Sequence, residues 1–221
     1  MSFKFKIFHF LLFTFYFSLF TSFVFPEVID RIVAVVNNQV ITLTELKIAR
    51  AFRLYPAPKS KQIMPASFYL EKLIEQRLVT QVAGQQVKVE NSEVEAYLEK
   101  IRNNLGPKVL EAKLQEFGLG KDDLEKYIYQ RILEDKIIRQ KLFQNVAVTL
   151  EDIENYYQQI YLPSQKAKGF KPQPLLEIVN KIEAVIKENK RREQVKDWIA
   201  NLKRQADIQI KVKNLDEYFK K

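Results

Sequence analysis

The chain has 221 residues, with 36 basic and 27 acidic side chains and a formal net charge of +9. It contains no cysteine, which excludes a disulfide framework and any cysteine-bound zinc site. Its single histidine, His9, lies within the first 25 residues, so the rest of the chain has no histidine to serve as a general base or metal ligand. We therefore predict no catalytic residue, no metal and no cofactor, and a protein that is not an enzyme.

The first 25 residues have the layout of an export signal. Lys4 and Lys6 precede residues 7–25, which carry no formal charge, and a positive segment followed by an apolar one is typical of a signal peptide. We predict that residues 1–25 are a signal peptide that is removed. The alternative is an uncleaved membrane anchor, because no Ala-x-Ala-like cleavage site is present and about 19 apolar residues are enough to span a bilayer.

Directly after this segment, the pattern predicts a β-hairpin. Residues 32–36 and 40–42 are β-branched apart from Ala34, and Asn37-Asn38 between them suit a type I′ turn. A two-residue turn sets the register. The predicted pairs are Val36 with Gln39, Val35 with Val40, and Ala34 with Ile41.

Helices are predicted to follow the hairpin. Thr42 and Glu45 form a Thr-x-x-Glu capping box at the start of the first helix, and Thr149 with Asp152 form a similar pair. Residues 55–64 contain two prolines and are predicted to be an exposed loop. Apolar residues then recur at intervals of three and four, which predicts amphipathic helices. The predicted helical segments are 65–82, 94–105, 109–117, 124–142 and 178–202.

The last third of the chain contains a break and a strand. Residues 162–174 carry three prolines and one glycine without apolar periodicity, so we predict a linker there. The middle of the following helix, Lys187–Gln194, is almost wholly polar and is predicted to be exposed on all sides. Residues 208–213 alternate strictly between apolar and polar, as a half-buried strand does. Because a hairpin this apolar needs further cover, this strand is the expected third partner of the hairpin.

Four motifs in this order resemble the SurA-type periplasmic chaperones. They lie in residues 30–42, 73–78, 87–94 and 198–210, and the likeness extends over nearly all of residues 28–213. The resemblance implies a mainly α fold with a small N-terminal hairpin joined by a C-terminal strand. It also implies a chaperone domain over residues 26–161, with residues 175–221 packing back on it.

One departure from this family lies at the linker. The family commonly has a parvulin peptidyl-prolyl isomerase domain where only residues 162–174 stand here, and so short a segment cannot form a domain with its own core. The resemblance therefore implies an ATP-independent periplasmic holdase without isomerase activity. Its expected partners are unfolded or nascent envelope proteins, of the outer membrane or secreted, with aromatic-rich segments.

Two other functions remain as alternatives. A membrane-tethered envelope assembly or scaffold protein would retain residues 7–25 and associate with the membrane through them. A parvulin-like isomerase fits less well, because parvulin chemistry is described with active-site histidines. The basic run Lys187–Arg192 suits phosphate contacts, but export makes a nucleic acid partner unexpected, and we predict a solvated face attracted to anionic lipid head groups.

Candidate client-binding residues cluster around the proline-rich loop, where apolar side chains at the edge of a helical cradle suit a holdase. The alternative is ordinary packing of the loop on the helices. For Phe68, packing and client contact are expected equally. The acidic pairs Asp122-Asp123 and Glu134-Asp135 are attributed to helix starts and solvated faces. The predicted client-binding residues are Tyr55, Ile63, Met64, Phe68 and Tyr69.

Overall fold

The computed structural model describes residues 30–56, 64–83, 87–142 and 146–219. The described residues from Arg31 on form one compact unit, and the description below concerns this unit. The predicted signal peptide or anchor, residues 1–25, lies outside the described residues. Within the described ranges, no helix is both long and apolar enough to cross a membrane.

A three-stranded antiparallel sheet contains the predicted hairpin and its predicted third strand. Its strands are β1 (Ile32–Val36), β2 (Gln39–Thr42) and β3 (Ile208–Ile210), in the order β2-β1-β3. All three predicted β1–β2 pairs are confirmed. The turn type is corrected: Asn37 has a positive φ of 52° but Asn38 does not, whereas a type I′ turn needs both.

The pairing of β1 with β3 joins two segments that lie near opposite ends of the described chain. Ala34 pairs with Ile210 and Val36 with Ile208. Asn37 N donates to Asp207 O at 2.7 Å, and Lys211 N donates to Val33 O at 2.8 Å. The central strand β1 is therefore hydrogen-bonded on both sides, and β2 and β3 are the two edges.

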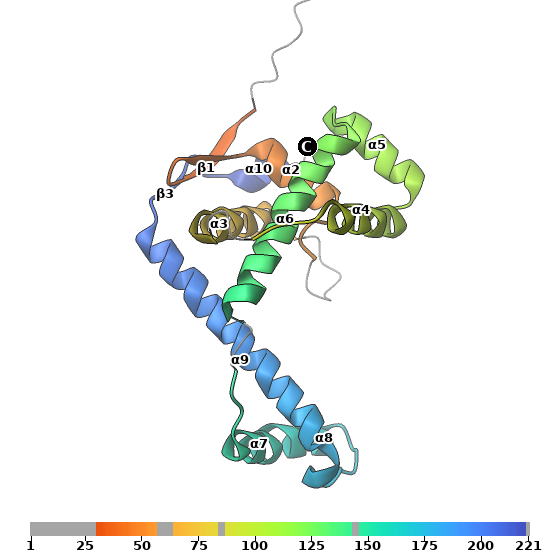
Figure 1. The fold of residues 1–221 in the computed structure, drawn as a ribbon, viewed down its shortest axis with the longest axis vertical. Helices are drawn as coiled ribbons and strands as arrows, with labels where there is room; N and C mark the ends of the chain where they lie inside the picture. Colours follow the sequence, from red (N-terminus) through yellow and green to blue (C-terminus); the bar gives the residue numbers. More distant parts are fainter. Residues whose placement is uncertain (1–29, 57–63, 84–86, 143–145, 220–221) are drawn as a thin grey trace, which may run out of the picture. The chain divides into compact units, whose positions relative to one another are not determined.

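The rest of the unit is helical, which confirms the mainly α prediction (Figure 1). Both predicted capping boxes are present, Thr42 with Glu45 and Thr149 with Asp152. The helices are α2 (Leu43–Ala51), α3 (Ala66–Ala83), α4 (Asn91–Leu105), α5 (Pro107–Phe117), α6 (Lys121–Leu142), α7 (Leu150–Tyr156), the π-helix η2 (Tyr157–Tyr161), α8 (Leu162–Ala167), α9 (Leu175–Gln205) and α10 (Leu215–Phe219).

The structure differs from the sequence analysis in the segment predicted to be a linker. Leu162–Ala167 forms α8, which continues from the π-helix, and only residues 168–174 are non-helical. Pro163 is the second residue of α8 and directly follows the π-helix, and the helix continues through it, so proline does not end the helix. The short helix α10 was not predicted.

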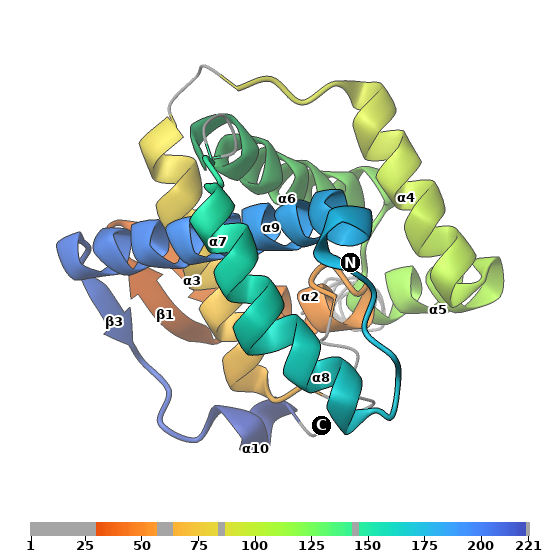
Figure 2. The same cartoon turned by 90° about the horizontal axis from the view of Figure 1, so that it is seen from below.

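Two ends of α9 pack against different partners. Near its start, Ile178, Ile182 and Ile186 form a small core with Ile153 of α7. Near its end, Ile199 packs with Val79 and Ile137 of α3 and α6. Seen from below in Figure 2, α7 crosses in front of α9. The helix therefore links a small lobe, formed by α7, η2, α8 and the start of α9, to the main core.

The polar middle of α9 is not exposed on all sides, contrary to the prediction. Lys190 Nζ lies 2.7 Å from Asp152 Oδ2 and donates to Ala147 O at 3.3 Å. The bond from Lys190, together with the hydrogen bonds that the backbone N–H and the hydroxyl of Thr149 donate to the carboxylate, lowers the pKa of Asp152 to about 2. The basic run thus contributes to holding α7 on α9.

Candidate functional site

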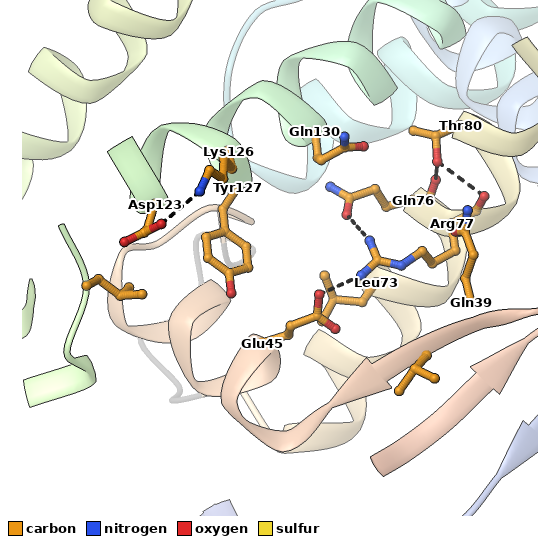
Figure 3. Close-up of a pocket in the computed structure, with 12 residues that line it drawn as sticks. Gln39, Glu45, Leu73, Gln76, Arg77, Thr80, Asp123, Lys126, Tyr127 and Gln130 are labelled. Carbon is orange, nitrogen blue, oxygen red and sulfur yellow. Dashed lines mark hydrogen bonds and ion pairs between the residues drawn. The ribbon is translucent and has the colours of Figure 1, made fainter. Parts of the chain in front are cut away.

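An open groove of about 610 Å³ lies between β2, the start of α2, α3 and the first half of α6 (Figure 3). Each of the two long helices, α3 and α6, lines the groove with four residues spaced i, i+3, i+4 and i+7. Residues at this spacing share one face of a helix. Twelve residues line it. They are Gln39 and Val40 from β2, Glu45 from α2, Leu73, Gln76, Arg77 and Thr80 from α3, Leu119 from the preceding turn, and Asp123, Lys126, Tyr127 and Gln130 from α6.

The strand β2 forms one wall of the groove and is an edge of the sheet. Val35 and Val40 face each other between two hydrogen-bonded pairs, so the peptide N–H and C=O of Val40 point away from β1. The Val40 side chain is 43% exposed. The groove thus has an apolar side chain and an open backbone edge at the same position.

Charged side chains in the groove occur as neutralising pairs. Arg77 Nη2 lies 2.6 Å from Glu45 Oε1, and both side chains are largely buried. Glu45 also caps α2, because its Oε2 accepts from Thr42 N at 3.1 Å. Lys126 Nζ donates to Asp123 Oδ1 at 2.9 Å, which with the Gly120 N–H lowers the pKa of Asp123. A charged ligand therefore meets no uncompensated charge among the lining residues.

Neutral amides and the Thr80 hydroxyl also line the groove. Gln39, Gln76 and Gln130 each carry a side-chain amide that can donate and accept at once. Gln76 is only 4% exposed, and its Oε1 accepts from Arg77 Nη1 at 3.2 Å. Val40, Leu73, Leu119 and Tyr127 supply apolar surface. Amide groups beside apolar patches match the chemistry of an extended polypeptide, whose backbone repeats the same donor and acceptor at every residue.

None of the four predicted client-binding residues that the structure describes lines this groove. Tyr55 and Tyr69 are 4% and 7% exposed and belong to the main core, and Met64 and Phe68 are half-buried against it. Phe68 packs edge-on to Tyr69, with ring centres 5.2 Å apart. Ile63 lies outside the described residues. The client-binding role of the five stays a prediction, and for the two tyrosines burial makes core packing the role visible in this structure.

Tyr55 is buried by a polar network that the sequence analysis missed. The Arg131 guanidinium lies 5.1 Å from the Tyr55 ring centre, and its Nη1 is 3.2 Å from Glu134 Oε2 and 2.6 Å from Asp135 Oδ1. Leu54 O accepts from both Arg131 Nε and Tyr97 Oη. This network attaches the end of α2 to α4 and α6.

The burial of Glu134 contradicts the expectation that the pair Glu134-Asp135 lies on a solvated helix face. It is only 4% exposed, and burial raises its pKa to about 7, although the nearby Arg131 opposes the shift. Burial likewise raises the pKa of Tyr55 well above its usual range. Neither group faces the groove. Across the described ranges, no group of three or more histidine, cysteine, aspartate or glutamate residues is placed to hold a metal ion.

The chain was compared with known proteins. No family model matches the chain. It is 23% identical over 212 residues to Chaperone SurA of Bordetella avium, a match that covers 87% of this chain and 41% of that protein. It is 29% identical over 142 residues to Chaperone SurA of Ralstonia nicotianae, covering 60% of this chain and 28% of that one. The chain is SurA-like.

The SurA-like chain spans less than half the length of these relatives. A third match, to Chaperone SurA of Legionella pneumophila, has 26% identity over 150 residues and covers 63% of this chain and 35% of the relative. These matches confirm the predicted resemblance. The groove residues of the SurA-like chain were missed in the sequence, although the spacing of Leu73, Gln76, Arg77 and Thr80 marks one helix face.

Proposed function

We propose that this SurA-like chain is a chaperone that holds unfolded segments of exported proteins in the groove. The observation that carries the proposal is the combination of three glutamine amides with apolar side chains beside an open strand edge. Chaperones are also what the matched relatives are named. The binding follows from general polypeptide chemistry, so no nucleotide and no catalytic group enters it.

The client segment binds in extended form along β2. Its backbone bonds to the open peptide group of Val40 and to the amides of Gln39 and Gln130, whichever residues the client carries. Its side chains, aromatic ones above all, contact Val40, Leu73, Leu119 and Tyr127. Each contact is weak, so affinity comes from their sum and release needs no energy source.

The chaperone acts in the periplasm after removal of residues 1–25. Residues 26–161 and 175–221 act as one module, because β3 and α10 belong to the same sheet and core as the hairpin. Its clients are outer-membrane or secreted proteins. Residues 162–174 stand in the place of a parvulin domain, and a proline-isomerisation assay is expected to give the background rate.

A pair of valine substitutions tests the groove. Val40 in the groove and Val109 on α5 have nearly equal exposure, 43% and 45%, and Val109 does not line the groove. Val40→Lys puts a charge beside the client backbone and should weaken binding of an unfolded outer-membrane-protein peptide by about tenfold, equivalent to about 1.4 kcal/mol. Val109→Lys adds the same charge outside the groove and should leave the affinity unchanged.

The measurements are fluorescence anisotropy of the labelled peptide and suppression of aggregation of the unfolded client. Circular dichroism checks that both variants keep their helical content. Equal loss of affinity in the two variants, or none in either, would show that clients do not bind in this groove. Failure of the unsubstituted protein to suppress aggregation would refute the chaperone function itself.

A further inference from the structure

The loop between α8 and α9 presents an exposed aromatic ring among lysines. Phe170 is 63% exposed, and Lys166, Lys168 and Lys171 around it are exposed too. Residues 155–176 contain these three lysines and no acidic residue. Within the described part of the chain, none of the three lysines forms an ion pair. We call residues 166–171 the Lys-Phe tip.

Backbone hydrogen bonds fix the Lys-Phe tip in this exposed position. Gly169 has a φ of 71°, and Phe170 N donates to Gln165 O at 3.0 Å, which closes the end of α8. Such helix ends commonly place an apolar residue back against the helix, yet here Phe170 stays exposed. The exposure of Phe170 is therefore not the result of an unstructured chain.

Two tyrosines of η2 hold the other side of the loop. Tyr157 Oη donates to Gln173 O at 2.9 Å, and Gln173 N donates to Tyr161 Oη at 3.3 Å. The two rings stack with centres 5.5 Å apart. Leu176, the second residue of α9, follows this loop and is 91% exposed. The end of the lobe thus carries apolar surface with positive charge beside it.

We propose that the Lys-Phe tip docks on an anionic phospholipid surface. An aromatic ring partitions into the interfacial region of a bilayer, and lysines around it reach the lipid phosphates while their aliphatic stems cover apolar surface. Each lysine near an anionic surface adds attraction that salt screens. A folded protein partner fits less well, because lysines are depleted from protein–protein interfaces.

Docking through this tip leaves the groove free. The helix α9 has 31 residues, a length of about 46 Å at 1.5 Å rise per residue. The tip lies at its N-terminal end, and β3 follows its C-terminal end (Figure 1). A chain bound to the membrane by the tip therefore keeps its sheet and groove exposed to the solvent.

Vesicle co-sedimentation tests the proposal on the chain that begins at Pro26. Every buried residue of the described core lies between Val33 and Phe219, so this start removes none of them. The unsubstituted chain should sediment with vesicles of phosphatidylcholine and phosphatidylglycerol, and not with vesicles of phosphatidylcholine alone. Raising the salt concentration should weaken the binding.

Substitutions in the tip separate the ring from the charges. Lys168→Gln with Lys171→Gln should lower the partition coefficient about 25-fold, about fivefold for each lysine. Phe170→Ala should lower it about tenfold through lost apolar contact. Lys108→Gln with Lys213→Gln removes the same charge from exposed positions elsewhere and should have little effect.

A fluorescent probe reports contact with the bilayer directly. The chain has no cysteine, so Leu176→Cys and Val109→Cys each provide a single site for an environment-sensitive label. The label at position 176 should shift to the blue on anionic vesicles, and the label at position 109 should not. Equal sedimentation with both kinds of vesicle, equal effects of the tip and control substitutions, or binding of poly-glutamate without binding of vesicles would overturn the proposal.

Discussion

The C-terminal helix α10 offers the sharpest test of how the chain closes on itself. Phe219 is 7% exposed, its ring centre lies 5.7 Å from that of Tyr69, and the Arg50 guanidinium lies 4.9 Å from its ring centre. Arg50 Nη1 also donates to Phe219 O at 3.1 Å, and Ala66 N donates to Asp216 Oδ1 at 2.9 Å. One aromatic side chain thus connects the end of the chain to α2 and α3.

We expect Phe219→Ala to lower the free energy of unfolding by about 3 kcal/mol. Loss of a buried phenylalanine ring costs roughly 3 to 5 kcal/mol, the sum of lost transfer free energy and the cavity left behind. The lower end applies here because α10 has only five residues and lies near the chain end, so it can shift or detach and limit the cost. Detachment would also weaken the hydrogen bond from Arg50.

Urea denaturation followed by far-ultraviolet circular dichroism measures this difference. Tyr218→Ala is the matched control, because Tyr218 is an aromatic residue of the same helix that is only half-buried and lies 4.2 Å from the Arg31 guanidinium. Loss of such a cation–π contact costs about 1 kcal/mol or less. Equal midpoints for the two variants, or a change under about 1 kcal/mol for Phe219→Ala, would refute the role given to α10.

Three further predictions concern stability. Deletion of residues 206–221 removes β3 and α10 together and should lower the melting temperature. An unchanged melting temperature would contradict the claim that these two elements stabilise the N-terminal hairpin and the core. The pKa of Glu134 is about 7 in the folded protein, above its ordinary value of 4.5, so the unfolded chain loses its proton first and stability falls as pH rises from about 4.5 through 7, by roughly 2 to 3 kcal/mol. Glu134→Gln should flatten this dependence when urea midpoints are compared across the same pH range, and an unchanged slope would assign it to other groups. Thr42→Ala removes the cap of α2 and should cost about 1 kcal/mol in urea denaturation, without the larger loss expected of a core residue.

Local chemistry accounts for the parts of the fold that were predicted correctly. The hairpin register depends on a two-residue turn between β-branched runs, and the start of α2 depends on Thr42 and Glu45, all close in sequence. The third strand could be predicted because residues 208–213 alternate, and the hairpin needed cover. Pro163 misled the prediction of a linker, because here the helix continues from η2 through the proline.

The candidate site could be predicted only in part. The face of α3 that lines the groove is visible as a spacing of three and four, but the same spacing marks any helix face. Which faces meet depends on the packing of α3 against α6 and on the edge position of β2. Tyr55 likewise looked exposed beside prolines, and it is buried because Arg131 and Tyr97 approach from distant helices.

The sequence by itself determined the hairpin and the helix starts, because each depends on residues within a few positions of one another. It also determined the resemblance to SurA chaperones, which depends on the order of four short motifs along the chain. The tertiary structure alone decided that three amides and an open strand edge share one groove, that Glu134 is buried, and that Phe170 is exposed. These outcomes depend on long-range packing, in which a side chain's surroundings come from segments tens of residues away. Burial and exposure are therefore properties of the assembled core, and local patterns constrain them without fixing them.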